Sequence, residues 1–228
     1  PAMQQLALGY YFLGKRELAA SIVTVAQSID AGYAESYVLL GFLALAKEDR
    51  IAATAAFKKA TELDPNLGVA WHNLAAQYLQ AKNYAEALPA AQRAVSLLPG
   101  LNGAHLNLGS ALRGQKRYAD AEKAYRRALE LEANYPEDFF NLGILYLDAK
   151  DMAGVDTIGR LNIAIQNLTR YKELGSFRLS KDDPADAYIK EARDGIDREL
   201  KRQQRQKKAQ ERQQPKDGAK PDAPKDAK

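Results

Sequence analysis

Residues 68–101 read GVAWHNLAAQYLQAKNYAEALPAAQRAVSLLPGL, and this stretch decides the fold because its pattern recurs along the chain. A leucine returns every 34 residues, and a small residue, Ala or Gly, follows each of these leucines. Such a period is typical of solenoids, in which each unit buries its apolar face only by stacking on its neighbours. The recurring leucines are Leu6, Leu40, Leu74, Leu108 and Leu142.

Within each unit the apolar residues follow two helical stripes. In the quoted stretch, Trp71, Leu74 and Tyr78 fall at i, i+3 and i+7, which is the spacing of one helix face. A short polar break follows, and then a second stripe that contains Ala87 and Ala94. Each unit is therefore predicted to be an antiparallel helical hairpin whose small residues allow the two helices to approach closely.

The pattern W-x-x-L-G-x-x-Y, then A-x-x-x-F, then A and P, resembles the tetratricopeptide repeat, most fully in residues 34–67 and 68–101. The resemblance implies an all-α fold, a right-handed superhelical solenoid of antiparallel helix pairs. Asp183 and Pro184 indicate the start of a further helix, and an apolar stripe at helical spacing predicts that it caps the C-terminal end of the solenoid. The residues of this stripe are Tyr188, Ile189, Ala192, Ile196 and Leu200. The expected parts are a solenoid at 1–175 with regular repeats at 1–33, 34–67, 68–101 and 102–135 and a divergent fifth at 136–175, a capping helix at 176–200, a basic Gln-rich helical extension at 201–213 and a disordered tail at 214–228.

The fifth unit departs from the period. Its second-helix alanine is Ala164, which lies 43 residues beyond Ala121 instead of 34, so nine residues are inserted. We place the insertion at 151–159, between the two helices of the unit. Both a tolerated loop, which costs little closure entropy, and a docking element are consistent with this position.

The end of the chain is basic. Residues 201–228 contain ten Lys or Arg and four Asp or Glu, whereas the whole chain carries a net charge of +4. The segment has no aromatic residue for base stacking, so nucleic acid is disfavoured, and contact with an acidic surface or a membrane is open. A solvated helix is the simpler alternative.

Several kinds of chemistry are excluded or disfavoured. With no cysteine the chain has no disulfide and no thiol nucleophile, and no apolar run approaches the roughly 18 residues of a membrane-spanning helix. The string from Gly9 to Lys15 resembles a phosphate-binding loop, but Arg16 stands where Ser or Thr must hold magnesium. His72 and His105 lie at different positions, or slots, of the 34-residue repeat, and no third metal ligand recurs at the same spacing. We therefore expect no enzyme, no catalytic residue, no metal site, no cofactor and no small-molecule substrate.

The resemblance implies that a partner protein binds as a peptide, strand or helix along the concave groove lined by the first helices of the units. Asn73, Asn107 and Asn141 are spaced by 34 and form a ladder that can clamp a peptide backbone, unless these amides bind only water. The amino-terminal half of the groove is apolar, so we expect a partner or a preceding repeat to cover it. The candidate partner-binding residues are Leu8, Tyr11, Phe12, Val38, Leu39, Phe42, His72, Asn73, Leu106, Asn107, Arg113, Phe140, Asn141 and Ile144.

A finer resemblance concerns the run from Phe139 to Lys201. Its insertion, its helix around Leu168–Lys172 and the basic tail that follows resemble the tetratricopeptide proteins of the myxobacterial adventurous-gliding machinery. This implies an exported envelope protein, lipid-anchored through an upstream cysteine, that scaffolds a motility complex in the periplasm or at the outer membrane. The cytoplasm is the alternative location.

The predicted function is a non-catalytic protein–protein interaction scaffold. One alternative is a structural subunit that assembles through its uncapped amino-terminal edge, formed by Leu6 and Tyr10. The other is an adaptor for a short peptide tail. Arg113 is the only basic residue at the groove slots, which disfavours a clamp for a terminal carboxylate.

Overall fold

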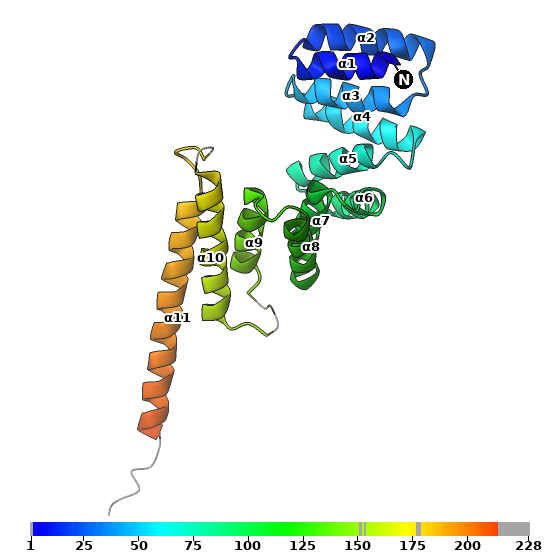
Figure 1. The fold of residues 1–228 in the computed structure, drawn as a ribbon. Coiled ribbons are helices and arrows are strands. Elements are labelled where there is room, and N and C mark those ends of the chain that lie inside the picture. The colour runs from blue at the N-terminus through cyan, green and yellow to red at the C-terminus, as the bar shows by residue number, and fades with distance from the viewer. Residues whose placement is uncertain (1, 151, 153, 177–178, 214–228) are drawn as a thin grey trace, which may run out of the picture.

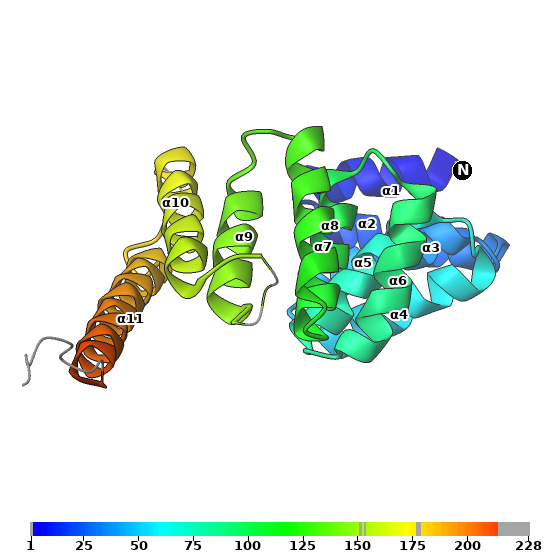
Figure 2. The same cartoon turned by 90° about the horizontal axis from the view of Figure 1, so that it is seen from below.

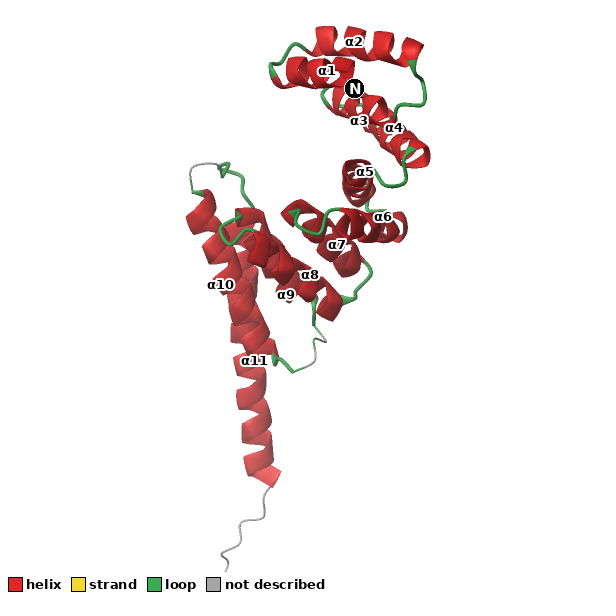
Figure 3. Cartoon of the chain, turned by 45° about the vertical axis from the view of Figure 1, so that its right-hand side comes forward, coloured by secondary structure: helices red, strands yellow, loops and turns green. Residues whose placement is uncertain are grey.

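The computed structural model describes residues 2–150, 152, 154–176 and 179–213, and over these residues it contains helices and no strand (Figure 3). The predicted tail at 214–228 lies outside the described residues, as do Asp151 and Ala153 of the insertion. The helices are α1 Ala2–Phe12, α2 Arg16–Ile29, α3 Ala34–Leu45, α4 Arg50–Leu63, α5 Gly68–Gln80, α6 Tyr84–Leu97, α7 Asn102–Gly114, α8 Tyr118–Leu131, α9 Pro136–Asp148, α10 Thr157–Gly175 and α11 Ala185–Gln213.

Consecutive helices pair as hairpins, and the hairpins stack from α1–α2 to α9–α10, with α11 against α10 at the far end (Figures 1 and 2). The first helices α1, α3, α5, α7 and α9 also contact one another in order, so they form one side of the stack. The predicted all-α solenoid of antiparallel helix pairs is therefore confirmed. No helix in the described part of the chain is long and apolar enough to cross a membrane.

The small residues of the repeat lie where helices meet. The second-helix alanines Ala53, Ala87 and Ala121 have no exposed surface. A β-carbon at Gly109 would lie 2.5 Å from the ring of Tyr125, so the chain has no room there for a side chain. The aromatic ring of one helix thus fills the space that glycine leaves on the other.

The nine inserted residues of the fifth unit divide between loop and helix. The linker between α7 and α8 is three residues long, whereas the linker from α9 to α10 runs over the eight residues 149–156. Five of the nine inserted residues therefore lengthen this linker. The other four extend α10, which begins seven residues before Ala164, whereas α8 begins only three residues before Ala121. The last part of the predicted insertion, 157–159, is therefore helical and does not project as a loop.

The predicted capping helix and basic extension form a single helix, α11. Within the expected segment 176–200 the helix begins at Ala185, directly after the predicted start at Asp183 and Pro184, and the Asp183 carboxylate accepts a hydrogen bond from the Ala185 amide at 2.9 Å. Ala185, Ile189 and Ala192 are buried, so the predicted apolar stripe does face the solenoid. Beyond Leu200 the described side chains of the helix, as far as 212, are exposed.

Candidate partner-binding groove

The side of the stack formed by the first helices has two hollows. The first, called here the apolar hollow, has a volume of about 240 Å³ and lies between α1, α3 and the start of α5. Six of its ten lining residues are apolar. They are Leu8, Val38, Leu39, Phe42, Leu67 and Val69, and the remaining lining residues are Gln4, Gln5, Tyr33 and Glu35.

An aromatic row adjoins the apolar hollow through Phe42, which lines it. The rings of Tyr11 and Phe42 stack with centroids 5.9 Å apart, and Phe42 meets Phe57 edge-on at 5.6 Å. Phe57 is fully buried, so the row connects the hollow to the core of the second unit. Val69, another lining residue, keeps 41% of its surface exposed, which leaves an apolar contact open to a partner.

One polar atom at the apolar hollow lacks a partner. Gln4 donates through Nε2 to Ser36 Oγ at 3.1 Å, but its Oε1 is buried and has no hydrogen-bond partner among the described residues. A buried acceptor without a donor costs about 1–3 kcal/mol. Because this oxygen is buried, a ligand in the hollow cannot reach it without a change in the Gln4 side chain.

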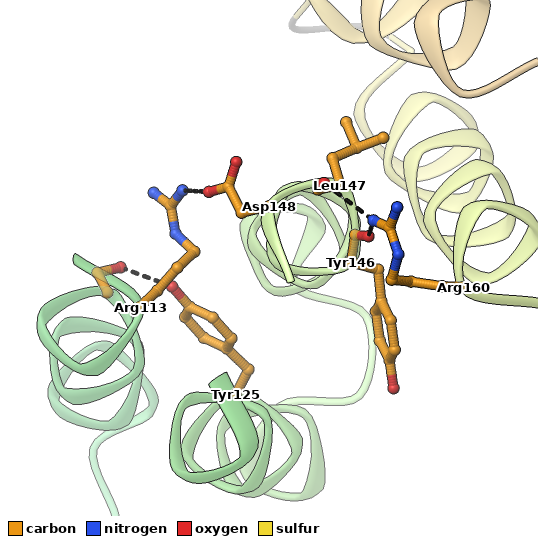
Figure 4. Close-up of polar contacts among 7 residues, drawn as sticks. Arg113, Tyr125, Tyr146, Leu147, Asp148 and Arg160 are labelled. Atoms are coloured by element: carbon orange, nitrogen blue, oxygen red, sulfur yellow. Dashed lines mark hydrogen bonds and ion pairs between the residues drawn. The ribbon is translucent and has the colours of Figure 1, made fainter. Parts of the chain in front are cut away.

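The second hollow, called here the polar hollow, has a volume of about 390 Å³ and is lined by residues of α5, α6 and α7 and the α5–α6 turn. Ser110 lies 3.1 Å from the Tyr125 hydroxyl, and Arg113 donates to Asp148 Oδ2 at 2.6 Å (Figure 4). Because Asp148 already pairs with Arg113, this guanidinium has less charge to offer a ligand carboxylate. The remaining lining residues are Ala76, Leu79, Gln80, Lys82, Tyr84 and Asn107.

The three asparagines of the ladder are not equivalent. Asn73 and Asn141 each donate through Nδ2 to a carbonyl oxygen one turn earlier in their own helix, both at 2.8 Å. Asn107 instead reaches from α7 to α5, where its Nδ2 lies 3.1 Å from the His72 carbonyl oxygen and 3.2 Å from His72 Nδ1. The Oδ1 atoms of all three make no hydrogen bond within the described part of the chain. These oxygens are what the ladder can offer to donors of a peptide backbone.

His72 is a packing residue between α5 and α7. A β-carbon at Gly103 would lie 3.0 Å from its ring, which shows how closely α7 approaches. Burial lowers the pKa of His72 from its ordinary 6.5, and the neutral ring accepts the bond from Asn107. Among the described residues no three His, Asp or Glu side chains lie close enough together to hold a metal ion.

Several predicted groove residues are covered by the solenoid itself. Val38, Leu39 and Leu106 are less than a tenth exposed and belong to the core, so Val38 and Leu39 line the apolar hollow with only a small part of their surface. Phe140 and Ile144 pack against the cluster that α10 and α11 form, and the Phe140 ring lies 5.0 Å from that of Tyr171. The apolar patch expected in the amino-terminal half is therefore smaller than the sequence predicted. It is open chiefly at Leu8, Tyr11, Phe42 and the 75% exposed Phe12.

Two buried charged residues were missed from the sequence. Arg160, in the extra turn of α10, donates through Nη1 to the carbonyl oxygens of Tyr146 and Leu147 in the last turn of α9 (Figure 4). Such carbonyls have no partner within their own helix, so the guanidinium caps α9. The sequence held a signal, because Arg160 stands one turn before Ala164 on the stripe that faces the core.

The other is Asp138, at the third residue of α9. It occupies the repeat slot of Ala70 and Ala104, and this unusual position was the signal. Its side chain is fully buried and accepts a hydrogen bond from Asn102 Nδ2 at 2.7 Å. Burial raises the pKa of Asp138 to about 7, against the lowering effect of the Asn102 bond.

Stacked hairpins with a one-sided groove define the class of α-helical repeat proteins. Residues 34–67, 56–88 and 103–135 each match a family model described as tetratricopeptide repeat. The chain therefore contains tetratricopeptide repeats, which the family models match in residues 34–88 and 103–135. No curated protein sequence matches it.

Solved structures share the fold at low sequence identity. PilW, described as a widely conserved type IV pilus biogenesis factor, aligns with a TM-score of 0.70 at 19% identity over 86% of this chain and 86% of its own. MamA from Desulfovibrio magneticus RS-1 gives 0.63 at 21%, over 78% and 96%. YrrB, described as a TPR protein with an unusual peptide-binding site, gives 0.62 at 20%, over 77% and 86%. At these identities the similarity concerns the fold alone.

Proposed function

We propose that the chain is a non-catalytic scaffold that binds a segment of a partner protein in its concave groove. The observation that carries the proposal is the apolar hollow, whose lining includes Leu8, Phe42 and the 41% exposed Val69. A volume of about 240 Å³ admits apolar side chains but not a folded domain. The preferred ligand of this hollow is therefore an extended segment or helix end that presents an apolar anchor.

The polar hollow extends the proposed contact toward the fourth unit. Asn107 and Ser110 place polar side chains there, and the ladder oxygens of Asn73 and Asn141 lie on the same set of first helices. A segment that leaves the apolar hollow along the first helices would meet these groups next. We propose that they hold its backbone, while the apolar hollow selects its side chains.

A finer proposal concerns the cellular complex in which the chain acts. The resemblance of residues 139–201 to tetratricopeptide proteins of the gliding machinery supports a partner within a bacterial envelope complex. The adaptor for a short peptide tail has less support, since the Arg113 guanidinium pairs with Asp148.

A matched pair of variants tests the groove. Val69 lines the apolar hollow with 41% of its surface exposed, and Ile51, 86% exposed on α4, lies outside it. Peptides selected by display for binding to residues 1–228 should carry apolar anchors. Val69→Glu should lower their affinity at least tenfold, whereas Ile51→Glu should leave the affinity unchanged. Peptides that bind both variants as they bind the parent protein would refute the groove. Replacing the three ladder asparagines with alanine tests their part separately.

The same variants test the setting. In pull-downs from the native source, identified by mass spectrometry, an envelope protein that is retained by Ile51→Glu and lost with Val69→Glu would support it. If only cytoplasmic proteins are lost with Val69→Glu, the envelope setting is contradicted, but binding in the groove is not.

A specific observation favours a second function, assembly through the amino-terminal edge. Leu6 is 53% exposed, whereas Leu74 and Leu142 at the same repeat slot are only 3% exposed because a preceding unit covers them. Met3 shares the Leu6 face at helical spacing and is also exposed. Leu6→Lys should lower the association measured by light scattering and leave peptide binding intact. An unchanged molar mass would argue against this edge as an interface.

A further inference from the structure

Within the described part of the chain, the last turns of α11 extend beyond the solenoid. Figures 1 and 3 show α11 as the outermost helix, running on past the end of α10. Every residue from Lys201 to Arg212 is exposed. This part of the helix therefore presents all its sides to whatever surrounds the protein.

The charges on this segment are not spread evenly around the helix. Lys201, Arg205, Lys208 and Arg212 follow one another at i, i+4, i+7 and i+11, which at about 100° per residue confines them to a strip roughly 60° wide. We call these four residues the basic stripe. None of the four forms an ion pair with another described residue.

The basic stripe faces away from the solenoid. The buried residues Ala185, Ile189 and Ala192 of the same helix lie roughly 160° around the axis from it on average. On the extension, the side that continues these buried residues carries three glutamines, Gln203, Gln206 and Gln210, and a single cation, Lys207. A flat surface can therefore meet all four cations at once without touching the solenoid, since α11 is the outermost element in both views (Figures 1 and 2).

We propose that the basic stripe binds the anionic head groups of a phospholipid membrane. Charge complementarity carries the proposal, because clustered Lys and Arg are attracted to acidic lipids within a Debye length of the surface. The segment from Lys201 to Arg212 contains no aromatic and no large apolar residue, so it lacks the anchors of a protein interface and the stacking groups of a nucleic-acid site. Binding to a layer of anionic lipid head groups requires only positive charge. The contact is independent of the groove and goes beyond the scaffold function.

Two pairs of substitutions that remove equal charge test the proposal. Arg205→Gln with Lys208→Gln removes two cations of the basic stripe, and Arg202→Gln with Lys207→Gln removes two that lie off it on the same segment. Binding of residues 1–228 to vesicles of phosphatidylcholine with phosphatidylserine is measured by co-sedimentation beside vesicles of phosphatidylcholine alone. Circular dichroism verifies that each variant keeps its helix.

We expect the parent protein to bind only the vesicles with phosphatidylserine. At roughly fivefold per residue the stripe pair should lose roughly 30-fold in partition, and the off-stripe pair only a few-fold. Equal losses in the two pairs would overturn the proposal, and so would binding to neutral vesicles. No binding to acidic vesicles, with capture of an acidic polypeptide or RNA instead, would overturn it in favour of another occupant. Val69→Glu should bind vesicles as the parent does, so failure of the groove and failure of the stripe are distinguishable.

Discussion

Replacing Asp138 with asparagine should remove a pH-dependent loss of stability. The Asp138 carboxyl has no exposed surface, receives one hydrogen bond from Asn102 at 2.7 Å, and its Oδ1 has no partner among the described residues. Burial raises its pKa from 3.8 to about 7, and the charges of Glu132 and Glu137 add to the increase. An asparagine of nearly the same shape keeps the packing and cannot ionise.

The sign and size of the effect follow from the raised pKa. Between pH 3.8 and about 7 the folded protein holds a proton that the unfolded chain has released, so the stability due to this group is complete below 3.8 and is lost as the pH rises through 7. Two pH units between 5 and 7 correspond to about 3 kcal/mol at 1.36 kcal/mol per unit. The free energy of unfolding of the parent protein should thus fall by up to about 3 kcal/mol relative to Asp138→Asn from pH 5 to pH 8.

Urea unfolding followed by circular dichroism at pH 5, 6, 7 and 8 measures this difference, and hydrogen exchange in α9 locates it. Other titrating groups, His72 among them, are shared by both proteins and cancel in the comparison. Asp197→Asn, an exposed carboxylate on α11, is the control and should follow the parent protein at every pH. A constant difference between Asp138→Asn and the parent from pH 5 to 8 would refute the reasoning, because Asp138 would then be ionised throughout.

Three further outcomes follow from single positions. Gly109→Ala should destabilise the protein by about 1–3 kcal/mol in urea unfolding, because its β-carbon would lie 2.5 Å from the Tyr125 ring. Gly9→Ala, which has open space around it, should stabilise the protein by roughly 0.5–1 kcal/mol. Equal effects of the two substitutions would contradict this packing. Arg160→Ala should lower the free energy of unfolding by roughly 2–4 kcal/mol and speed hydrogen exchange in α9, since it leaves the last carbonyls of α9 without their donor. Unchanged protection of the α9 amides would contradict the capping role of Arg160. Burial lowers the pKa of His72, so stability present above pH 6.5 should be lost as the pH falls, and an imidazole titration by NMR at or above 6.5 would contradict this.

The architecture could be predicted because the repeat places the same residue types at the same contacts. Leu74 and Leu142 are 3% exposed and Ala53 is fully buried, as a stack of hairpins requires. In such a stack each unit meets only its neighbours, so a local pattern contains most of the information about the fold.

The exposure of the groove residues could not be predicted in the same way. Leu39 and Leu106 stand at slots of the concave side but belong to the core, whereas Phe12 at a related slot is 75% exposed. A slot gives the direction in which a side chain leaves its own helix. Whether the next helix covers it depends on the distance between neighbouring units and on the size of their side chains, and neither is part of the repeat pattern.

The fifth unit shows a second limit. The displaced alanine Ala164 gives the number of inserted residues, but it does not say how many join a helix. The division depends on Arg160, whose guanidinium holds the added turn of α10 against the end of α9. A long-range contact of this kind has no periodic signature.

The seam between the fourth and fifth units lies between the two hollows and the basic stripe. At this seam the amide of Asn102 in α7 binds both Asp138 of α9 and the Ala128 carbonyl of α8. Both hollows lie on α1 to α7 and the turns between them, and the basic stripe lies on α11, so the exchange of Asp138 for asparagine changes no side chain of either surface. Asp138→Asn should therefore bind peptides and acidic vesicles as the parent does. Loss of either activity would mean that the placement of the fifth unit governs binding, and the local arguments for both surfaces would then fail.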